Sequence, residues 1–145
     1  MKRPEERFDF SAMPQRAKLK LPDDARMAVY LVVNVEEWDI GKPIAREYVT
    51  SPAGVQTVPN VPNWAWHEYG MRVGIWRLMD SLAKRGLKAG AAINARVCEG
   101  AGEPVAAAMR DAGWGFLGHG YAQAAIHTLQ NQEAAIAKSF EVLKN

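Results

Sequence analysis

The residues best suited to chemistry in this sequence are two adjacent carboxylates and one imidazole. Glu36 and Glu37 come directly after the apolar run 29–35, where packing requires no acidic residue. His119 stands between two glycines, which let the backbone approach a ligand closely and leave the imidazole uncrowded. Carboxylates and imidazoles exchange protons with water and also bind metal cations. The sequence therefore predicts acid–base chemistry or a cation site, provided that the fold brings these side chains together.

Strand and helix patterns alternate through the part of the chain that carries these residues. The run 29–35 is almost entirely apolar, which predicts a strand buried on both faces. Apolar residues at spacings of three and four predict the helices. The expected strands are 27–35, 89–93 and 114–117, and the expected helices are 68–85, 104–112 and 131–144. This order predicts an α/β fold in which parallel strands alternate with helices through right-handed crossovers.

Parallel strands point in the same direction, so their carboxyl ends meet at one edge of the sheet, where α/β proteins bind ligands. Glu36 and Glu37 follow the first expected strand, Asn94 follows the second, and His119 follows the third. We therefore expect these side chains to converge on one site. The amide of Asn94 is a candidate donor to the oxyanion that forms when water attacks a carbonyl.

A long connection, residues 36–67, separates the first expected strand from the first expected helix. Connections of this length are usually functional loops or lids. Its tryptophans, Trp38, Trp64 and Trp66, either stack on a ring-shaped ligand or pin the loop onto the sheet. His67 and His127 are expected to make local hydrogen bonds or to face solvent. Residues 1–26, which are polar and contain three prolines, predict an irregular N-terminal arm.

Composition restricts the class of protein. A chain of 145 residues with 48% hydrophobic and 23% charged residues suits one soluble domain. The net charge of +2 argues against nucleic acid as a partner, and no apolar run is long enough to span a membrane. The single cysteine, Cys98, and the lack of an apolar leader favour the cytoplasm. No glycine-rich phosphate loop follows the first strand.

Two short motifs in this framework resemble those of a known family, the polysaccharide deacetylases of the NodB-homology type. Residues 34–38 (NVEEW) take the place of its Thr-Phe-Asp-Asp-Gly motif, and residues 119–123 (HGYAQ) take the place of its His-Ser/Thr-x-x-His motif. The segments 68–78 and 114–120 resemble the allantoinase-like branch of cyclic-amide hydrolases. The resemblance implies that residues 27–145 form the N-terminal half of a distorted (β/α)7 TIM-like barrel.

Carried over position by position, the resemblance implies that Glu36 is the catalytic base. It also implies that Glu37 and His119 are metal ligands. This sequence departs from the family where both aspartates have become glutamates and where Gln123 replaces a second histidine. Glutamine is a poor ligand for zinc. The expected cofactor is therefore either none or a divalent metal such as zinc, held by Glu37, His119 and Gln123.

Residues and resemblance together favour a hydrolase of C–N bonds other than peptide bonds. It would be an amide deacetylase of carbohydrate metabolism or a cyclic-amide or ureide hydrolase, with small amides, ureides or N-acetyl sugars as substrates. The Glu36 and Glu37 pair would activate water, and the substrate-binding residues would be Asn94, Arg72, Trp38 and Trp66. The alternative is a truncated or degenerate domain that binds a ligand or partner without catalysis. Because an open sheet has unpaired edges, the chain is expected either to be a fragment of a longer protein or to have its barrel completed by a second copy or a second chain.

Overall fold

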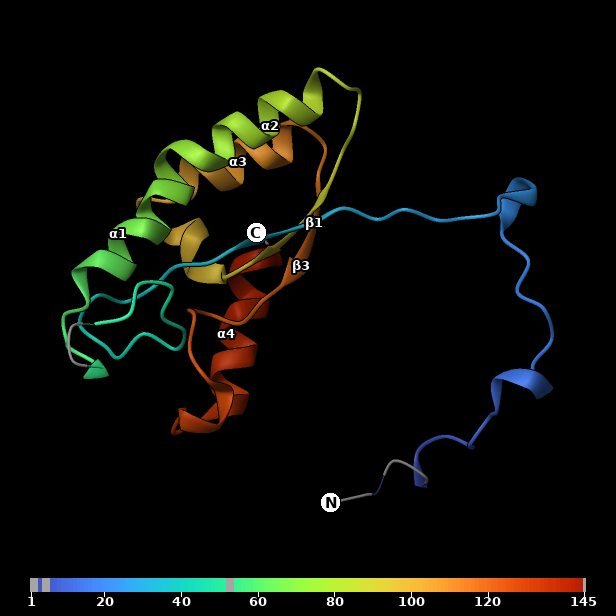
Figure 1. The fold of residues 1–145 in the computed structure, drawn as a ribbon, viewed down its shortest axis with the longest axis horizontal. Coiled ribbons are helices and arrows are strands. Elements are labelled where there is room, and N and C mark those ends of the chain that lie inside the picture. The colour runs from blue at the N-terminus through green and yellow to red at the C-terminus, as the bar shows by residue number, and fades with distance from the viewer. Residues whose placement is uncertain (1–2, 4–5, 52–53, 145) are drawn as a thin grey trace.

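The computed structural model describes residues 3, 6–51 and 54–144, and its ribbon is shown in Figure 1. Strands and helices alternate along the chain as the sequence predicts. Two helical turns, η5 and η6, follow α1 and β2 directly. The elements are β1 (Val32–Val35), α1 (Val61–Tyr69), η5 (Gly70–Gly74), α2 (Ile75–Ala83), β2 (Gly90–Ile93), η6 (Ala95–Glu99), α3 (Glu103–Asp111), β3 (Gly115–Gly118), η7 (Ile126–Thr128) and α4 (Gln132–Lys144).

The described strands form one parallel sheet in the order β1-β2-β3. Val35 is paired with Ile93, and Ile93 is paired with Gly118, so the strands end at the same level. This register places the residues that follow the strands in one row at the carboxyl edge. The predicted α/β fold with a parallel sheet is confirmed.

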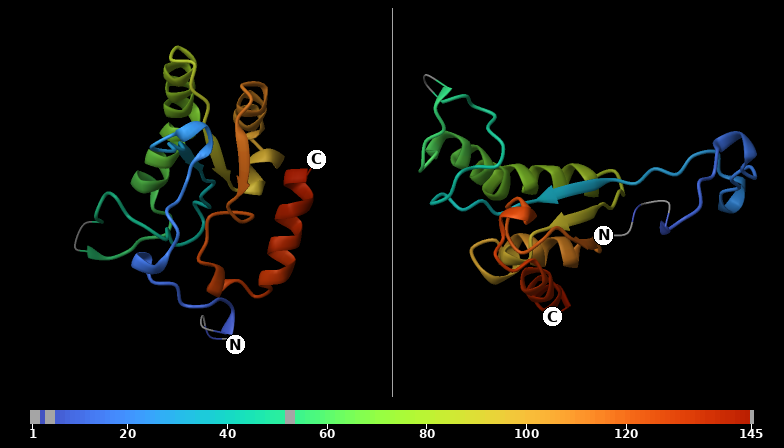
Figure 2. Two further views of the ribbon diagram at one scale, coloured as in Figure 1. Left: turned by 90° about the vertical axis from the view of Figure 1, so that its right-hand side faces the viewer. Right: turned by 90° about the horizontal axis from the view of Figure 1, so that it is seen from below.

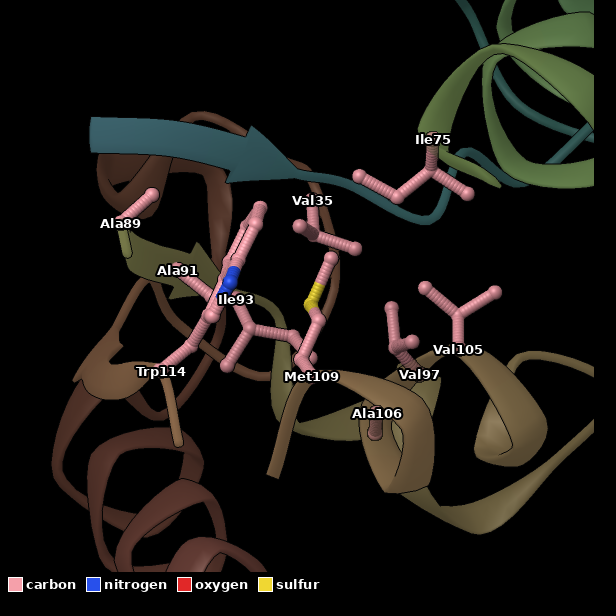
Figure 3. Packing of buried hydrophobic residues seen from close by; sticks show 10 residues of the cluster. All are labelled: Val35, Ile75, Ala89, Ala91, Ile93, Val97, Val105, Ala106, Met109 and Trp114. Atoms are coloured by element: carbon pink, nitrogen blue, oxygen red, sulfur yellow. The ribbon is translucent and has the colours of Figure 1, made fainter. Parts of the chain in front are cut away.

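The core lies between the sheet and the helices α2 and α3. Val35 and Ile93 from the strands pack with Ile75 of α2 and Met109 of α3, and Trp114 closes the cluster next to β3 (Figure 3). Ile93 and Met109 have no exposed surface. Full burial of such a side chain stabilises the fold by about 1.5–3 kcal/mol. The core thus fixes the ends of β1 and β2, from which the candidate site residues project.

The two largest differences from the prediction are the start of the first helix and the start of the first strand. The expected connection 36–67 contains helix α1, which begins at Val61 rather than at 68. Asn60 caps it, because its side chain accepts a hydrogen bond from the Asn63 backbone at 3.3 Å, and Pro62 is tolerated in the first turn. The prolines hid this helix from the sequence pattern. Residues 52–53 of the connection lie outside the described residues.

The first strand is shorter than expected and is not buried on both faces. Pairing with β2 begins where the Gly90 N–H donates to the Leu31 carbonyl at 2.8 Å. Val29 and Tyr30 precede that point and are 77% and 66% exposed. The prediction of a buried strand over the whole run was wrong, because β2 starts too late to pair with its first residues.

The described residues before Leu31 form an extended segment with two short 3-10 turns, Met13–Gln15 and Pro22–Asp24. This segment reaches away from the sheet and helices (Figures 1 and 2). Residues 1–2 and 4–5 of the predicted arm lie outside the described residues. Within the described part of the chain, no helix has the length and apolar character needed to cross a bilayer.

Candidate active site at the carboxyl edge of the sheet

The register of the sheet brings Glu36, Asn94 and His119 together. The Asn94 N–H donates to the Val35 carbonyl, and the His119 N–H donates to the Ile93 carbonyl, each at 3.0 Å. Each of the three residues therefore comes directly after the last paired residue of its strand. The register therefore places Glu36, Asn94 and His119 next to one another, as the sequence predicts for these three residues.

Glu36 is held through both carboxylate oxygens. Its Oε1 lies 3.2 Å from Nε2 of His119, and its Oε2 accepts a hydrogen bond from the Trp38 indole N–H at 3.0 Å. The Glu36 side chain is 19% exposed and the His119 side chain 34% exposed. Because an ionised carboxylate has about four lone-pair sites, Glu36 retains acceptor positions for a water molecule. The arrangement suits a fixed general base.

Asn94 holds the site together from inside. Its side-chain oxygen accepts a hydrogen bond from the Glu37 N–H at 3.0 Å, and its side-chain nitrogen donates to the His119 carbonyl. Asn94 has no exposed surface. Its amide therefore ties the end of β1 to the end of β3 and offers no surface for the substrate contact predicted from sequence.

Glu37 and Glu36 use different partners. Glu37 Oε1 lies 3.0 Å from Nε of Arg96, a residue of η6 that the sequence did not single out. The Gln123 N–H donates to the Glu37 carbonyl at 3.1 Å, so the loop after β3 is anchored to the end of β1. Glu36 therefore contacts His119 and Trp38, whereas Glu37 contacts Arg96, and the two carboxylates do not act as a pair.

The predicted metal ligands do not fit a metal centre in this arrangement. The Glu37 carboxylate is neutralised by Arg96, and Gln123 offers a donor that zinc disfavours. In the ranges 6–51 and 54–144, no three side chains of His, Cys, Asp or Glu are grouped closely enough to hold a cation. No chemical step is therefore assigned to a metal.

Arg72 lies away from these residues. It pairs with Glu68 at 2.7 Å on the outer surface of the α1–η5 segment, and its side chain is 71% exposed. The Arg72 side chain therefore does not lie at the carboxyl edge, where the predicted substrate contact would be. Trp66 lies closer to the site, because it stacks on Tyr48 with ring centroids 4.3 Å apart and lines the pocket beside Glu36.

A pocket of about 310 Å³ opens next to Glu36. Its wall includes His67, whose ring stacks on Trp38 at 4.1 Å and has an Nε2 atom without a hydrogen-bond partner among the described residues. Burial lowers the pKa of His67, although the Glu36 carboxylate partly opposes this shift. Sequence reasoning gave His67 a local role and did not single out Tyr48. Recognition of helix α1 could have found His67, because this helix carries His67, which stacks on Trp38, and Trp66, which stacks on Tyr48.

Comparison with known proteins places the fold. No protein-family model matches the sequence, and no curated protein sequence matches it significantly. The fold matches solved deacetylase and allantoinase domains, which have TIM-like barrels. The crystal structure of Puue allantoinase matches with a TM-score of 0.72 and 22% identity. That of a probable polysaccharide deacetylase from Pseudomonas aeruginosa PAO1 matches with a TM-score of 0.65 and 24% identity.

In both comparisons the match covers 86% of this chain and 44% of the other chain. The chain therefore spans less than half the length of either solved structure. The predicted resemblance to the deacetylase and allantoinase fold, over about half of its barrel, is confirmed.

Proposed function

We propose that this chain carries part of the active site of a hydrolase that cleaves C–N bonds other than peptide bonds. One observation carries the proposal: Glu36 is fixed between His119 and the Trp38 indole at the mouth of a pocket, on the carboxyl edge of a parallel sheet. This edge is where α/β proteins place their ligands. The two solved neighbours, named as an allantoinase and a probable polysaccharide deacetylase, support the same class of reaction.

Glu36 acts as the general base in this proposal. Its carboxylate takes a proton from water, and the water oxygen forms a bond with the substrate's carbonyl carbon. When the C–N bond breaks, the leaving nitrogen receives that proton. His119 keeps the Glu36 carboxylate in position and shares the proton during transfer. Substrates of this class are small amides, ureides and N-acetyl sugars.

A second candidate function is ligand binding without chemistry. The observation that favours it is the Glu37–Arg96 ion pair, which occupies the carboxylate that the resemblance assigns to a metal. A degenerate site of this kind would bind amides but would not turn them over. Activity measurements separate the two candidates.

The same proposal includes a partner that completes the sheet. Among the described strands, β1 and β3 are edge strands, and each has one side without a hydrogen-bonded neighbour. Phe116 and Leu117 on β3 are 40% and 41% exposed. Additional parallel strands, from a longer chain, a second copy or a second chain, would pair with these edges. The mass of the native protein in solution, by light scattering, tests this; a monomer of 16.0 kDa contradicts it.

The proposed activity is tested with acetamide, allantoin and N-acetylglucosamine as substrates, by measuring ammonia, ureide cleavage and acetate respectively. We expect hydrolysis of at least one compound, and we expect Glu36→Gln to abolish it. Glu37→Gln is the matched control, because it makes the same substitution one residue further and removes a contact with Arg96 only. If the two variants lose activity equally, or if no compound is cleaved by the native assembly, the proposal fails.

A further inference from the structure

A second polar cluster holds the loop after β3, residues 119–123, which begins at His119. Tyr121 lies two residues after His119, and its hydroxyl donates a hydrogen bond to Oε2 of Glu99 at 2.9 Å. The same hydroxyl accepts a hydrogen bond from Nζ of Lys138 at 2.8 Å. Nζ of Lys138 also lies 3.9 Å from Oε2 of Glu99. Each of the three polar groups therefore contacts the other two.

The members of this cluster come from three separate parts of the chain. Glu99 is the last residue of η6, Tyr121 belongs to the loop after β3, and Lys138 lies in the middle of α4. Helix α4 packs against both η6 and β3 (Figures 1 and 2). The cluster therefore ties the loop to two helical elements by side-chain contacts.

Backbone hydrogen bonds give the same loop its path. The N–H groups of Ala95 and Arg96 donate to the carbonyls of Gly120 and Tyr121, each at 2.9 Å. Gly120 has φ +80°, a backbone conformation that favours glycine and redirects the chain between the imidazole of His119 and the phenol of Tyr121. A displacement of Tyr121 is therefore transmitted to His119 through a single intervening residue.

The cluster is suited to fixing one loop and not to holding the whole fold. The side chains of Lys138 and Glu99 are 52% and 40% exposed, and an ion pair with this exposure adds little to global stability. Nζ of Lys138 lies 4.1 Å from the centre of the Tyr121 ring, which adds a cation–π contact to the hydrogen bond. All of these contacts converge on Tyr121.

We infer that Tyr121 is a positioning residue, held by Glu99 and Lys138 so that the backbone of His119 stays in place beside Glu36. The inference rests on the proposed hydrolytic function, in which His119 keeps the Glu36 carboxylate in position. Catalytic geometry tolerates little displacement of the reacting groups. A loosened loop should therefore slow the reaction while the fold stays intact.

The first experiment removes the phenol hydroxyl from the full chain. Tyr121→Phe keeps the ring but loses both hydrogen bonds, so kcat on the best amide substrate should fall by about two- to tenfold. KM should change by less than about twofold, because Tyr121 acts through His119 and not on the substrate. The midpoint of urea unfolding should stay within about 0.5 M of the wild type.

Tyr69→Phe is the matched control for this variant. It removes an exposed hydroxyl that accepts a hydrogen bond from Arg77 at 2.9 Å, and it should leave kcat unchanged. The inference is overturned if Tyr121→Phe has the kcat of the wild type. It is equally overturned if kcat and the unfolding midpoint fall together, since Tyr121 would then have a structural role only.

Substitutions of the two partners separate the hydrogen bond from the charge. Glutamine at position 99 still accepts from the Tyr121 hydroxyl, so Glu99→Gln should retain most of kcat, whereas Glu99→Ala should match Tyr121→Phe. Lys138→Met should lower kcat. Lys84→Met breaks an exposed ion pair with Asp80 at 2.6 Å and should not. Equal effects of the two lysine variants would count against the role of Lys138 and overturn the inference.

Amide hydrogen exchange tests the hold on the loop without any substrate. In Tyr121→Phe the Arg96 N–H, which donates to the Tyr121 carbonyl, should exchange about two- to tenfold faster than in the wild type. The Gly90 N–H donates to the Leu31 carbonyl at 2.8 Å, away from the loop, and should keep its rate. Unchanged exchange at Arg96 overturns the inference.

The two readouts distinguish this inference from the proposed function. Faster exchange at Arg96 in a protein that hydrolyses none of the amides supports the hold on the loop and contradicts the hydrolase. Hydrolysis with the same kcat in the wild type and in Tyr121→Phe supports the hydrolase and overturns the inference, whether or not exchange is faster.

Discussion

The Glu36 carboxylate and the His119 imidazole are in contact at 3.2 Å although 83 residues separate them in the sequence. The contact depends on two strand registers in succession, since β1 and β3 both pair with β2 and both end level with Ile93. Asn94, at the end of β2, links the backbones of the residues on either side of it. A shift of one residue in either register would turn one of the two side chains to the opposite face.

Removal of the His119 imidazole should weaken hydrolysis without unfolding the chain. In His119→Ala, Glu36 keeps its hydrogen bond from Trp38 but loses the group that shares its proton. Loss of a positioned acid–base group lowers kcat by about 10²–10⁴-fold. The measurement is kcat on the best amide substrate, with the circular dichroism spectrum as a check on folding. The exposed His127, changed to alanine, is the control and should retain full activity.

Trp38 makes two contacts, and one substitution can remove the first while keeping the second. Its indole N–H donates to Glu36 at 3.0 Å, and its ring stacks on His67 at 4.1 Å. Trp38→Phe keeps an aromatic ring but removes the donor, so the Glu36 carboxylate should have a less defined position. We expect kcat to fall by about tenfold, as expected for a hydrogen bond to a charged group. An unchanged kcat would show that this hydrogen bond does not affect catalysis.

The part of the site formed by the strand ends can be predicted from the sequence alone, because it depends only on the parallel direction of the strands. Glu36, Asn94 and His119 each end a strand, and parallel strands that end at one edge must bring them together. The direction of the Glu37 side chain could not be predicted, since its partner Arg96 lies on η6, whose turn depends on backbone hydrogen bonds to Gly120 and Tyr121.

The pocket was also beyond the reach of sequence patterns. Its wall includes His67 and Trp66, which stand on α1, and the prolines around that helix indicate a loop. The position of Tyr48 depends on Asn63, whose buried side chain accepts hydrogen bonds from the Tyr48 and Val49 backbone at 2.8 and 2.9 Å. Contacts of this kind between a loop and a helix leave no periodic signal in the sequence.

Asn94 should contribute to stability more than a surface asparagine does. Asn94→Ala leaves the partly buried Glu37 N–H and His119 carbonyl without their side-chain partner, at up to about 1–3 kcal/mol for each group. Urea unfolding measures the loss of free energy. Asn131→Ala is the matched control: it removes one exposed hydrogen bond to the Ala134 N–H and should cost about 0.5–2 kcal/mol. Equal losses in the two variants would contradict the positioning role of Asn94.

Met109 tests whether α3 anchors the sheet that carries the site. Its side chain has no exposed surface and packs in the same cluster as Val35 and Ile93. Met109→Ala should lower the free energy of unfolding by about 2–5 kcal/mol. Met27→Ala, at a position that is 76% exposed, should change it by less than about 0.5 kcal/mol. A small effect at Met109 would mean that the core collapses around the cavity.

His67 should make stability depend on pH in a defined direction. Burial lowers the pKa of His67 below its ordinary value of 6.5, with Glu36 opposing the shift. Between the lowered pKa and pH 6.5, the unfolded chain binds more protons at this residue than the folded chain does. The free energy of unfolding should therefore rise with pH through this window and gain nothing further from His67 above it.

Urea unfolding at a series of pH values measures this dependence in the wild type and in two variants. His67→Phe should remove the His67 contribution, so the difference between the wild type and this variant should grow as pH increases toward 6.5. His127→Phe makes the same substitution at an exposed histidine and is the reference for the change of side chain. If the wild type and His67→Phe have the same slope, His67 is as easily protonated in the folded chain as in the unfolded chain.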